Sequence, residues 1–332
     1  MKKYKFLAIM AALLLLVLAA CGKKDEATEE TSTDTGTVKE ETPAAEEASV
    51  FPLTITQPNG LAEVTLEQKP EKVVVFDFGF LDTLDALGVD VTGVVQQNVP
   101  EYLSKYADKD AYQNIGSLKE PDFEAIHAMQ PDVIFISGRQ ADAFEELNKI
   151  APTVFVGLDN HDYVNSFKAN TELAGKIFGK EAEVATALEE IDTKTAELAA
   201  KTANMDEKAL IVLGNEGELS AYGPGSRFGV IHDVFGFKAV DEGLDDSTHG
   251  SSVSFEYVLE KNPDILFVVD RDAAVSEGES GTKAAIENEI VSKTNAAKNG
   301  KIFYLEPDVW YLSGGGIQSE KAKIEAATAA VQ

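Results

Sequence analysis

The sequence predicts an α/β protein with two similar lobes, each built on a parallel central sheet, joined by a single long α-helix. Residues 123–139 (FEAIHAMQPDVIFISGR) and 255–271 (FEYVLEKNPDILFVVDR) match without a gap at an offset of 132 residues, which indicates an internal duplication. Short apolar runs alternate with helical patterns, as in parallel sheets. Between the two halves, residues 181–204 contain neither Gly nor Pro and carry apolar residues at helical spacing.

Each copy of the repeat predicts the same local structure. A short helix begins at Phe-Glu, Pro-Asp ends it, and a buried strand follows at 133–136 or 265–268. An Arg lies just past the carboxyl end of that strand, the edge at which open α/β sheets bind ligands. Further strands are expected at 72–76, 91–95, 153–156, 209–213 and 302–305, with a helix at 81–87.

The amino-terminal part predicts a lipid-anchored export product. Three Lys precede an apolar run that ends in Leu18-Ala19-Ala20-Cys21, so residues 1–20 indicate a signal peptide and Cys21 resembles the lipidated cysteine of a lipoprotein. The alternative is an ordinary signal peptide with a chance Cys. Residues 21–52 are predicted to be an acidic, disordered tether. The body then divides into an N-terminal lobe (53–180), a linking helix (181–204) and a C-terminal lobe (205–332).

Composition narrows the possible partners. The formal net charge is −28, which argues against nucleic acid, and Cys21 is the single cysteine, so no intramolecular disulfide can form. The chain has no closely spaced His pair and no Cys cluster, which gives little support to a zinc or manganese site held by protein ligands alone.

The three arginines form the main candidate site. Only Arg139, Arg227 and Arg271 are Arg among 29 basic residues, and all three fall where a predicted strand or turn ends. A planar guanidinium gives bidentate contacts, stacks on aromatic rings and keeps its charge when partly desolvated. The alternative for any one of them is a surface charge or an internal salt bridge. Together they predict a site for a planar aromatic anion, with Ser226 before Arg227 as a further contact.

Other candidates lie in two loops and on two helices. His249 and Tyr311 can donate to an incompletely coordinated Fe(III), although a capping His and a packing Tyr explain them equally well. Trp310 is either a wall of the ligand site or part of the core, and Gly314–Gly316 permits close backbone approach. Glu124 and Glu256 occupy the same repeat position and form a pair that a two-fold partner can contact, or are simple helix-start charges.

These features together resemble a known family. The stretches KVVVFDFGFLDTLDALG, GSLKEPDFEAI, GPGSRFGVIHDVFG, STHGSSVSFEY and WYLSGGG are similar to those of class III substrate-binding lipoproteins of ABC importers. Within that class the chain resembles the ferric catecholate-siderophore binders of Gram-positive bacteria, of the petrobactin-binding type. The similarity covers residues 70–318 and implies two Rossmann-like lobes with the siderophore held between them.

The resemblance also implies a role for each candidate. Arg139, Arg227 and Arg271 match the arginines that bind catecholate oxygens, and His249 and Tyr311 match residues that complete the iron shell. Glu124 and Glu256 match the carboxylates that dock on the permease. We therefore expect a monomeric, non-enzymatic receptor on the outer face of the cell membrane, without a cofactor, that passes a ferric siderophore to an ABC permease and its ATPase. Heme, a ferric hydroxamate, a corrinoid and a surface hydrolase activity are the alternatives.

Overall fold

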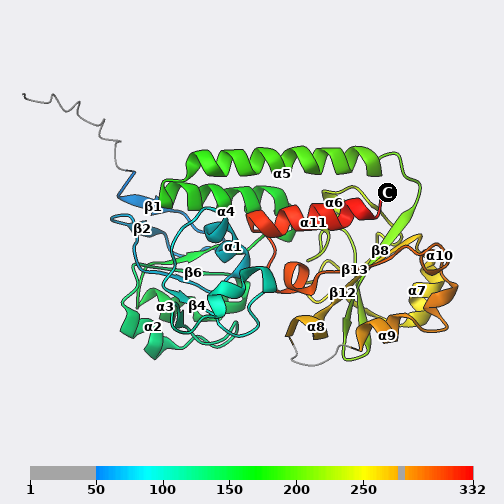
Figure 1. Cartoon of the computed structure of the whole chain (residues 1–332), viewed down its shortest axis with the longest axis horizontal. Helices are drawn as coiled ribbons and strands as arrows, with labels where there is room; N and C mark the ends of the chain where they lie inside the picture. The colour runs from blue at the N-terminus through cyan, green and yellow to red at the C-terminus, as the bar shows by residue number, and fades with distance from the viewer. Residues whose placement is uncertain (1–49, 276–280, 332) are drawn as a thin grey trace, which may run out of the picture. The chain divides into compact units, whose positions relative to one another are not determined.

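The computed structural model describes residues 50–275 and 281–331, and a parallel sheet organises the first half of this range (Figure 1). Its strand order is β5-β4-β3-β6-β7, and every neighbouring pair is parallel. The strands are β3 (Val73–Val75), β4 (Gly93–Val94), β5 (Gln113–Asn114), β6 (Val133–Ile136) and β7 (Thr153–Phe155). An antiparallel pair, β1 (Leu53–Ile55) with β2 (Val64–Leu66), precedes them.

Helices connect these parallel strands, as crossovers between parallel neighbours require. They are α1 (Phe78–Ala86), η1 (Glu101–Ala107), α2 (Phe123–Met129), η2 (Gly138–Ala143) and α3 (Phe144–Asn148). Two further helices, η3 (Asn160–Asp162) and α4 (Tyr163–Phe178), follow β7 in the chain. The predicted signal peptide, Cys21 and tether residues 21–49 lie outside the described residues. Within the described ranges, no helix combines the length and the apolar character needed to cross a membrane.

A second sheet organises the other half of the chain. Its order is β11-β9-β8-β12-β13, with β10 also paired to β8. The strands are β8 (Lys208–Asn215), β9 (Glu218–Tyr222), β10 (Lys238–Ala239), β11 (Ser251–Val253), β12 (Ile265–Asp270) and β13 (Ile302–Leu305). The helices are α6 (Val230–Asp233), α7 (Phe255–Lys261), α8 (Arg271–Val275), α9 (Thr282–Ile286), η4 (Val291–Lys293) and α10 (Asn295–Lys298).

The second sheet is mixed, because antiparallel strands extend the parallel strands that the sequence predicts. Strands β8 and β9 form an antiparallel hairpin, and β11 pairs antiparallel with β9. The hairpin turn consists of Glu216 and Gly217, both with positive φ (52° and 83°). A two-residue turn of this kind matches the twist of the flanking strands and returns the chain at once to a neighbouring position. Strands β8, β12 and β13 pair in parallel, as predicted.

The duplication seen in the sequence is also present in the backbone. Helices α2 and α7 begin after the side-chain caps Asp122 and Ser254 and end at left-handed Gln130 and Asn262. The Asp of each Pro-Asp pair then accepts a backbone N–H at the start of the neighbouring strand. Asp132 accepts from Lys72 N at 2.8 Å, and Asp264 accepts from Lys208 N at 3.0 Å. The repeated Pro-Asp therefore ends one helix and fixes the start of the adjacent strand in both sheets.

Helix α5 (Glu181–Thr202) lies in the chain between the two sheets, where one long helix was predicted. Helix α11 (Ile317–Ala329) contacts both α5 and α1 (Figure 1). The last helix in the sequence therefore packs against the first helix of the N-terminal half rather than only against its own half. The lobe boundaries at 53–180, 181–204 and 205–332 stay a prediction.

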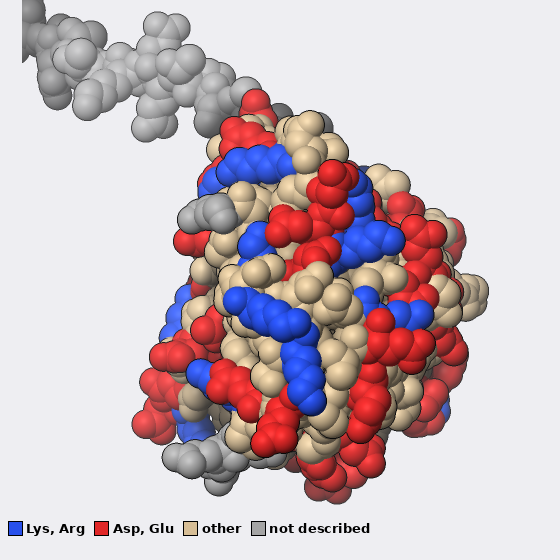
Figure 2. Space-filling model, turned by 90° about the vertical axis from the view of Figure 1, so that its right-hand side faces the viewer, with Lys and Arg blue, Asp and Glu red and all other residues tan. Residues whose placement is uncertain are grey.

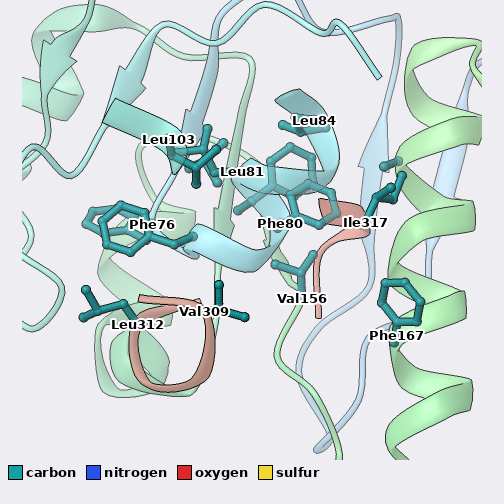
Figure 3. Packing of buried hydrophobic residues seen from close by; sticks show 14 of the residues in the cluster. Phe76, Phe80, Leu81, Leu84, Leu103, Val156, Phe167, Val309, Leu312 and Ile317 are labelled. Carbon is teal, nitrogen blue, oxygen red and sulfur yellow. The ribbon is translucent and has the colours of Figure 1, made fainter. Parts of the chain in front are cut away.

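One hydrophobic cluster connects these parts. Figure 3 shows Phe80, Leu84 and Ile317 close together, with Val309 and Leu312 from the segment before α11 nearby. The same cluster reaches Ile211 on one face of β8, whereas Leu210 on the opposite face belongs to a second cluster. Strand β8 is thus buried on both faces, as the apolar run in its sequence predicts.

Acidic residues outnumber basic ones in the chain, 57 to 29. On the face shown in Figure 2, Asp and Glu side chains spread over much of the area and Lys and Arg side chains gather near its middle. This distribution matches the net charge of −28. An anionic ligand therefore needs positive charge that is concentrated locally.

Candidate functional site

Arg139 is placed by the turn that follows β6. Ser137 and Gln140 form a capping box at the start of the 3₁₀ helix η2, so the backbone of this turn is fixed. The guanidinium then reaches a distant part of the chain. Its two terminal nitrogens donate to the carbonyl oxygens of Tyr311 at 3.0 Å and of Leu312 at 3.4 Å.

Arg227 follows a tight turn of the second half. Gly225 has a φ of 73°, and its N–H donates to Asp233 Oδ2 at 2.7 Å. The Ser226 hydroxyl donates to Gly223 O at 2.6 Å, and Ser226 is buried. That hydroxyl is therefore used inside the turn, and a ligand contact by Ser226 stays a prediction. Arg227 itself donates to Tyr311 O at 2.6 Å.

The Arg227 guanidinium is held among aromatic rings. Its central carbon lies 4.4 Å from the centroid of the Tyr311 ring and 5.3 Å from that of Phe228. Burial and the neighbouring charge of Arg139 lower the pKa of Arg227. The side chain still carries its charge near neutral pH, because arginine does not lose its proton in proteins. Two like charges held together in this way favour an anion between them.

Arg271 begins α8 directly after β12, the position that corresponds to Arg139. Its Nε donates to the Tyr311 hydroxyl at 3.0 Å, and it also donates to Asn215 Oδ1. The predicted shared location of the three arginines is therefore found in the structure. Arg139 and Arg227 meet at the backbone carbonyl of Tyr311, and Arg271 binds its hydroxyl.

Tyr311 lies in a single π-helical turn, η5 (Asp308–Leu312). Such turns are often found at functional sites. Burial, the largest single influence, acts to raise the pKa of Tyr311. The hydrogen bond from Arg271 and the charges of Arg227 and Arg271 outweigh it, so that the net pKa is lowered. A phenol with a lowered pKa forms the phenolate more readily, and a phenolate is a good oxygen donor to Fe(III).

Two hollows meet at this cluster. The larger, about 410 Å³, is lined by Arg139, Arg227, Trp310, Thr248 and Lys323 among others. The smaller, about 290 Å³, is lined by Arg139, Arg271 and Tyr311. Arg139 lines both hollows, Arg227 lines the larger one, and Arg271 and Tyr311 line the smaller one.

The glycines after Tyr311 serve close packing, as predicted. A Cβ on Gly316 would lie 2.3 Å from Asp82 Oδ2, and a Cβ on Gly79 would lie 2.1 Å from Gly314 O. The close approach is between α1 and the start of α11. Asp82 of α1 accepts the N–H groups of Gln318 at 2.8 Å and Ser319 at 2.7 Å. The glycine-rich segment is therefore clamped to the N-terminal half.

His249 is exposed, and Thr248 rather than His249 lines the larger hollow. The loop that carries it is ordered by Ser247, whose hydroxyl donates to Gly250 O at 3.3 Å. No group of three or more His, Cys, Asp or Glu side chains arranged to hold a metal occurs in the described part of the chain. Iron binding by His249 stays a prediction.

The sequence left open whether Trp310 is part of the core or a wall of the ligand site. In the structure Trp310 is buried in the core and also lines the larger hollow. The sequence reasoning missed Lys323 and Glu320, which are buried on α11. A signal was present, because Ile317, Glu320, Ile324 and Ala327 recur at helical spacing and put Glu320 on the buried face.

The paired acidic residues lie on equivalent helices. Glu124 and Glu256 are each in the first turn of their helix, α2 and α7, and both are exposed. Phe123, beside Glu124, is an exposed large apolar side chain. These positions are open to a partner.

Comparison with known proteins gives consistent results. A family model described as periplasmic binding protein matches residues 73–309. The petrobactin-binding protein YclQ of Bacillus subtilis is 44% identical over 321 residues, covering 96% of both chains. The ferric-anguibactin-binding protein FatB of Vibrio anguillarum is 35% identical over 272 residues, covering 80% of this chain and 84% of FatB.

Solved structures agree with the sequence comparison. The crystal structure of YclQ superposes with a TM-score of 0.81 at 45% identity, covering 84% of this chain and 98% of the YclQ chain. The catecholate-siderophore-binding protein VctP of Vibrio cholerae gives a TM-score of 0.79 at 36% identity, covering 83% of this chain and all of VctP (100%). Both structures therefore have the same two-sheet fold.

Proposed function

This chain belongs to the periplasmic binding protein family, and from that premise we propose that it captures a ferric catecholate siderophore of the petrobactin type for an ABC iron importer. The observation that carries the proposal is the convergence of all three arginines on Tyr311 at the edge of two hollows. The relatives named for petrobactin and ferric anguibactin, and the catecholate-binding VctP structure, support the ligand class.

The arginine cluster suits this ligand better than the alternatives. A ferric catecholate is an anion whose charge is spread over oxygens at the edges of planar rings. Guanidinium groups donate to such oxygens in pairs and stack on the rings, and each charge-assisted contact contributes roughly 1.5–3 kcal/mol. A ferric hydroxamate carries little charge and gains less from three cations. Iron here is cargo, and no resident cofactor is part of the proposal.

The wider role is proposed as follows. Cys21, outside the described residues, anchors the protein by lipid to the outer face of the cell membrane, and residues 21–52 act as a tether. The protein acts as a monomer without enzymatic activity and passes its cargo to a permease and its ATPase. Relatives described as substrate-binding lipoproteins of ABC transporters support this role.

Binding selectivity tests the proposed function. The tether-free body is titrated with ferric petrobactin, a ferric bis-catecholate and a ferric hydroxamate while quenching of Trp310, the single tryptophan, is followed. We expect submicromolar affinity for the catecholates and at least tenfold weaker binding of the hydroxamate, about 1.4 kcal/mol. Equal or tighter binding of the hydroxamate, or binding of neither class, contradicts the proposal.

Tyr311 is expected to donate its phenolate to iron when the siderophore leaves positions open. The ferric bis-catecholate should change its visible charge-transfer band on binding the wild type, and Tyr311→Phe should abolish that change. Tyr222→Phe is a matched control, because burial raises the pKa of Tyr222 to about 12 and its ring packs on Phe228. Identical spectra for wild type and Tyr311→Phe would show that Tyr311 is not an iron ligand.

Glu124 and Glu256 are proposed to dock the loaded protein on the permease. Changing both to Gln should slow siderophore uptake into cells while leaving the affinity for the ferric siderophore in solution within twofold of wild type, since both residues are exposed and line neither hollow. Asp122, the cap of α2, must be kept so that the helix start is unchanged. Wild-type uptake by the double variant would rule out this role.

A further inference from the structure

A buried charged cluster lies between α4 and α11, beside the larger hollow. It consists of Tyr163, Glu320 and Lys323, and the two charged residues are each only 4% exposed. The Lys323 ammonium donates to Tyr163 Oη at 2.6 Å and to Glu320 Oε1 at 2.9 Å. Glu320 also accepts the Tyr163 hydroxyl and the N–H of Gly315. One oxygen of the carboxylate, Oε1, thus accepts all three of these hydrogen bonds.

The ammonium of Lys323 has one donor left over. A lysine ammonium carries three N–H donors, and Tyr163 and Glu320 take two among the described residues. Lys323 also lines the larger hollow. A Cβ on Gly314 would lie 3.0 Å from Lys323 Nζ, so glycine at this position leaves the space beside the ammonium open.

Trp310 forms a wall of the hollow beside the Lys323 ammonium. It is 3% exposed, it lines the same hollow, and its indole Nε1 has no hydrogen-bond partner among the described residues. The Lys323 ammonium lies 5.5 Å from the indole ring. A buried donor without an acceptor costs about 1–3 kcal/mol. That nitrogen has almost no exposed surface, so Trp310 lines the hollow through its other atoms.

The balance of charge favours an anionic group here. A buried ion pair adds little to stability compared with apolar residues of the same volume, so stability alone does not explain why Lys323 lies beside a hollow. Two further cations, Arg139 and Arg227, line the same space, and Asp77 is the acidic residue among its lining side chains. A carboxylate oxygen that accepts from the Lys323 ammonium forms a charge-assisted hydrogen bond, which is the stronger kind.

We propose that Lys323 and Trp310 form a second subsite that binds a carboxylate on the part of the siderophore that links its iron-binding groups. The inference rests on the proposed function and deepens it. The arginines and Tyr311 hold the iron-binding end, whereas Lys323 and Trp310 select among siderophores by their linker.

The test compares two synthetic ferric bis-catecholates with identical arms. One linker carries a free carboxylate and the other a methyl group in its place, and matching visible spectra in solution ensure that the carboxylate does not bind the iron. Calorimetry gives the ratio of the two dissociation constants for each protein. For the wild type we expect at least tenfold tighter binding of the carboxylate ligand.

Variants of the buried cluster test whether the tighter binding of the carboxylate ligand depends on Lys323 and Trp310. Glu320→Gln/Lys323→Met removes both charges together, so that no buried charge is left unpaired, and should bring the ratio to within twofold. Trp310→Phe should lower the ratio at least threefold and serves as the second variant if the first does not fold. Glu190→Gln/Lys321→Met is the matched control, because it makes the same changes at a more exposed ion pair between α5 and α11. It should keep the wild-type ratio.

The outcomes separate the two proposals. If neither ferric ligand binds the wild type, the proposed function and the subsite both fail. If the methyl ligand binds and the carboxylate gives no advantage, only the subsite fails. The subsite also fails if the ratio of the two dissociation constants is the same in wild type and Trp310→Phe. Lys323 and Trp310 would then serve packing alone.

Discussion

Replacing Arg227 by alanine is expected to weaken ferric catecholate binding by about tenfold to a hundredfold. Arg227 is partly buried, it stacks on the Tyr311 ring at 4.4 Å, and like charge from Arg139 acts on it. The loss of one charge-assisted contact of roughly 1.5–3 kcal/mol corresponds to this range. Calorimetric titration of a ferric bis-catecholate measures it directly.

Two further variants sharpen this prediction. Arg227→Lys keeps the charge but loses the planar fork, and should recover less than half of the lost binding free energy. Lys149→Ala removes a cation from an exposed pair with Glu146 and should leave the affinity unchanged within twofold. If Arg227→Ala binds as tightly as the wild type, the arginine cluster does not hold the ligand.

Asp82 is expected to give the protein an unusual pH dependence of stability. Burial, opposed by the N–H groups of Ser319 and Gln318, raises the pKa of Asp82 from 3.8 to about 6. Between these values the folded state binds more protons than the unfolded state, so the free energy of unfolding falls as pH rises. The shift corresponds to about 3 kcal/mol, as an order of magnitude.

Denaturant titrations of wild type, Asp82→Asn and Asp241→Asn from about pH 2 to pH 7 measure the free energy of unfolding at each pH. The free energy of unfolding of the wild type is subtracted from that of Asp82→Asn, so the carboxylates that both proteins share cancel. This difference should increase as pH rises toward about 6, because the wild type loses stability and the Asn variant does not. Asp241 gives a control of opposite sign, because hydrogen bonds from Lys261, Gly243 and Tyr257 lower its pKa to about 2. The stability that the ionised Asp241 carboxylate contributes should be lost as pH falls below about 4. A flat difference curve for Asp82→Asn would contradict the account of the α1–α11 clamp.

Much of the fold could be predicted because the chain contains the same local pattern twice. Strands 133–136 and 302–305 agree with β6 and β13 residue for residue, and the predicted helix 181–204 differs from α5 only at its end. These elements depend on local periodicity. The β8–β9 hairpin was missed because Glu216 at positive φ is an unusual turn residue, so the sequence there carried a weak turn signal.

The sequence predicted that the three arginines share one location, but it did not predict the contacts between them. All three side chains contact Tyr311 in the structure, and their binding of a ligand stays a prediction. Arg227 and Arg139 both donate to the backbone carbonyl of Tyr311, which lies 84 and 172 residues away from them in the sequence. Local sequence patterns do not encode such long-range contacts. Helical spacing puts Glu320 on the buried face of α11, but the contact of Lys323 with Tyr163, 160 residues away, is not encoded locally.

The central claim is tested most directly by locating iron in crystals grown with a ferric bis-catecholate. Anomalous diffraction at the iron edge fixes the metal position without reference to the protein. We predict one iron peak at the junction of the two hollows, within bonding distance of the Tyr311 hydroxyl, with Arg139, Arg227 and Arg271 donating to catecholate oxygens. An iron position away from Tyr311, or catecholate oxygens bound by none of the three arginines, would contradict the account.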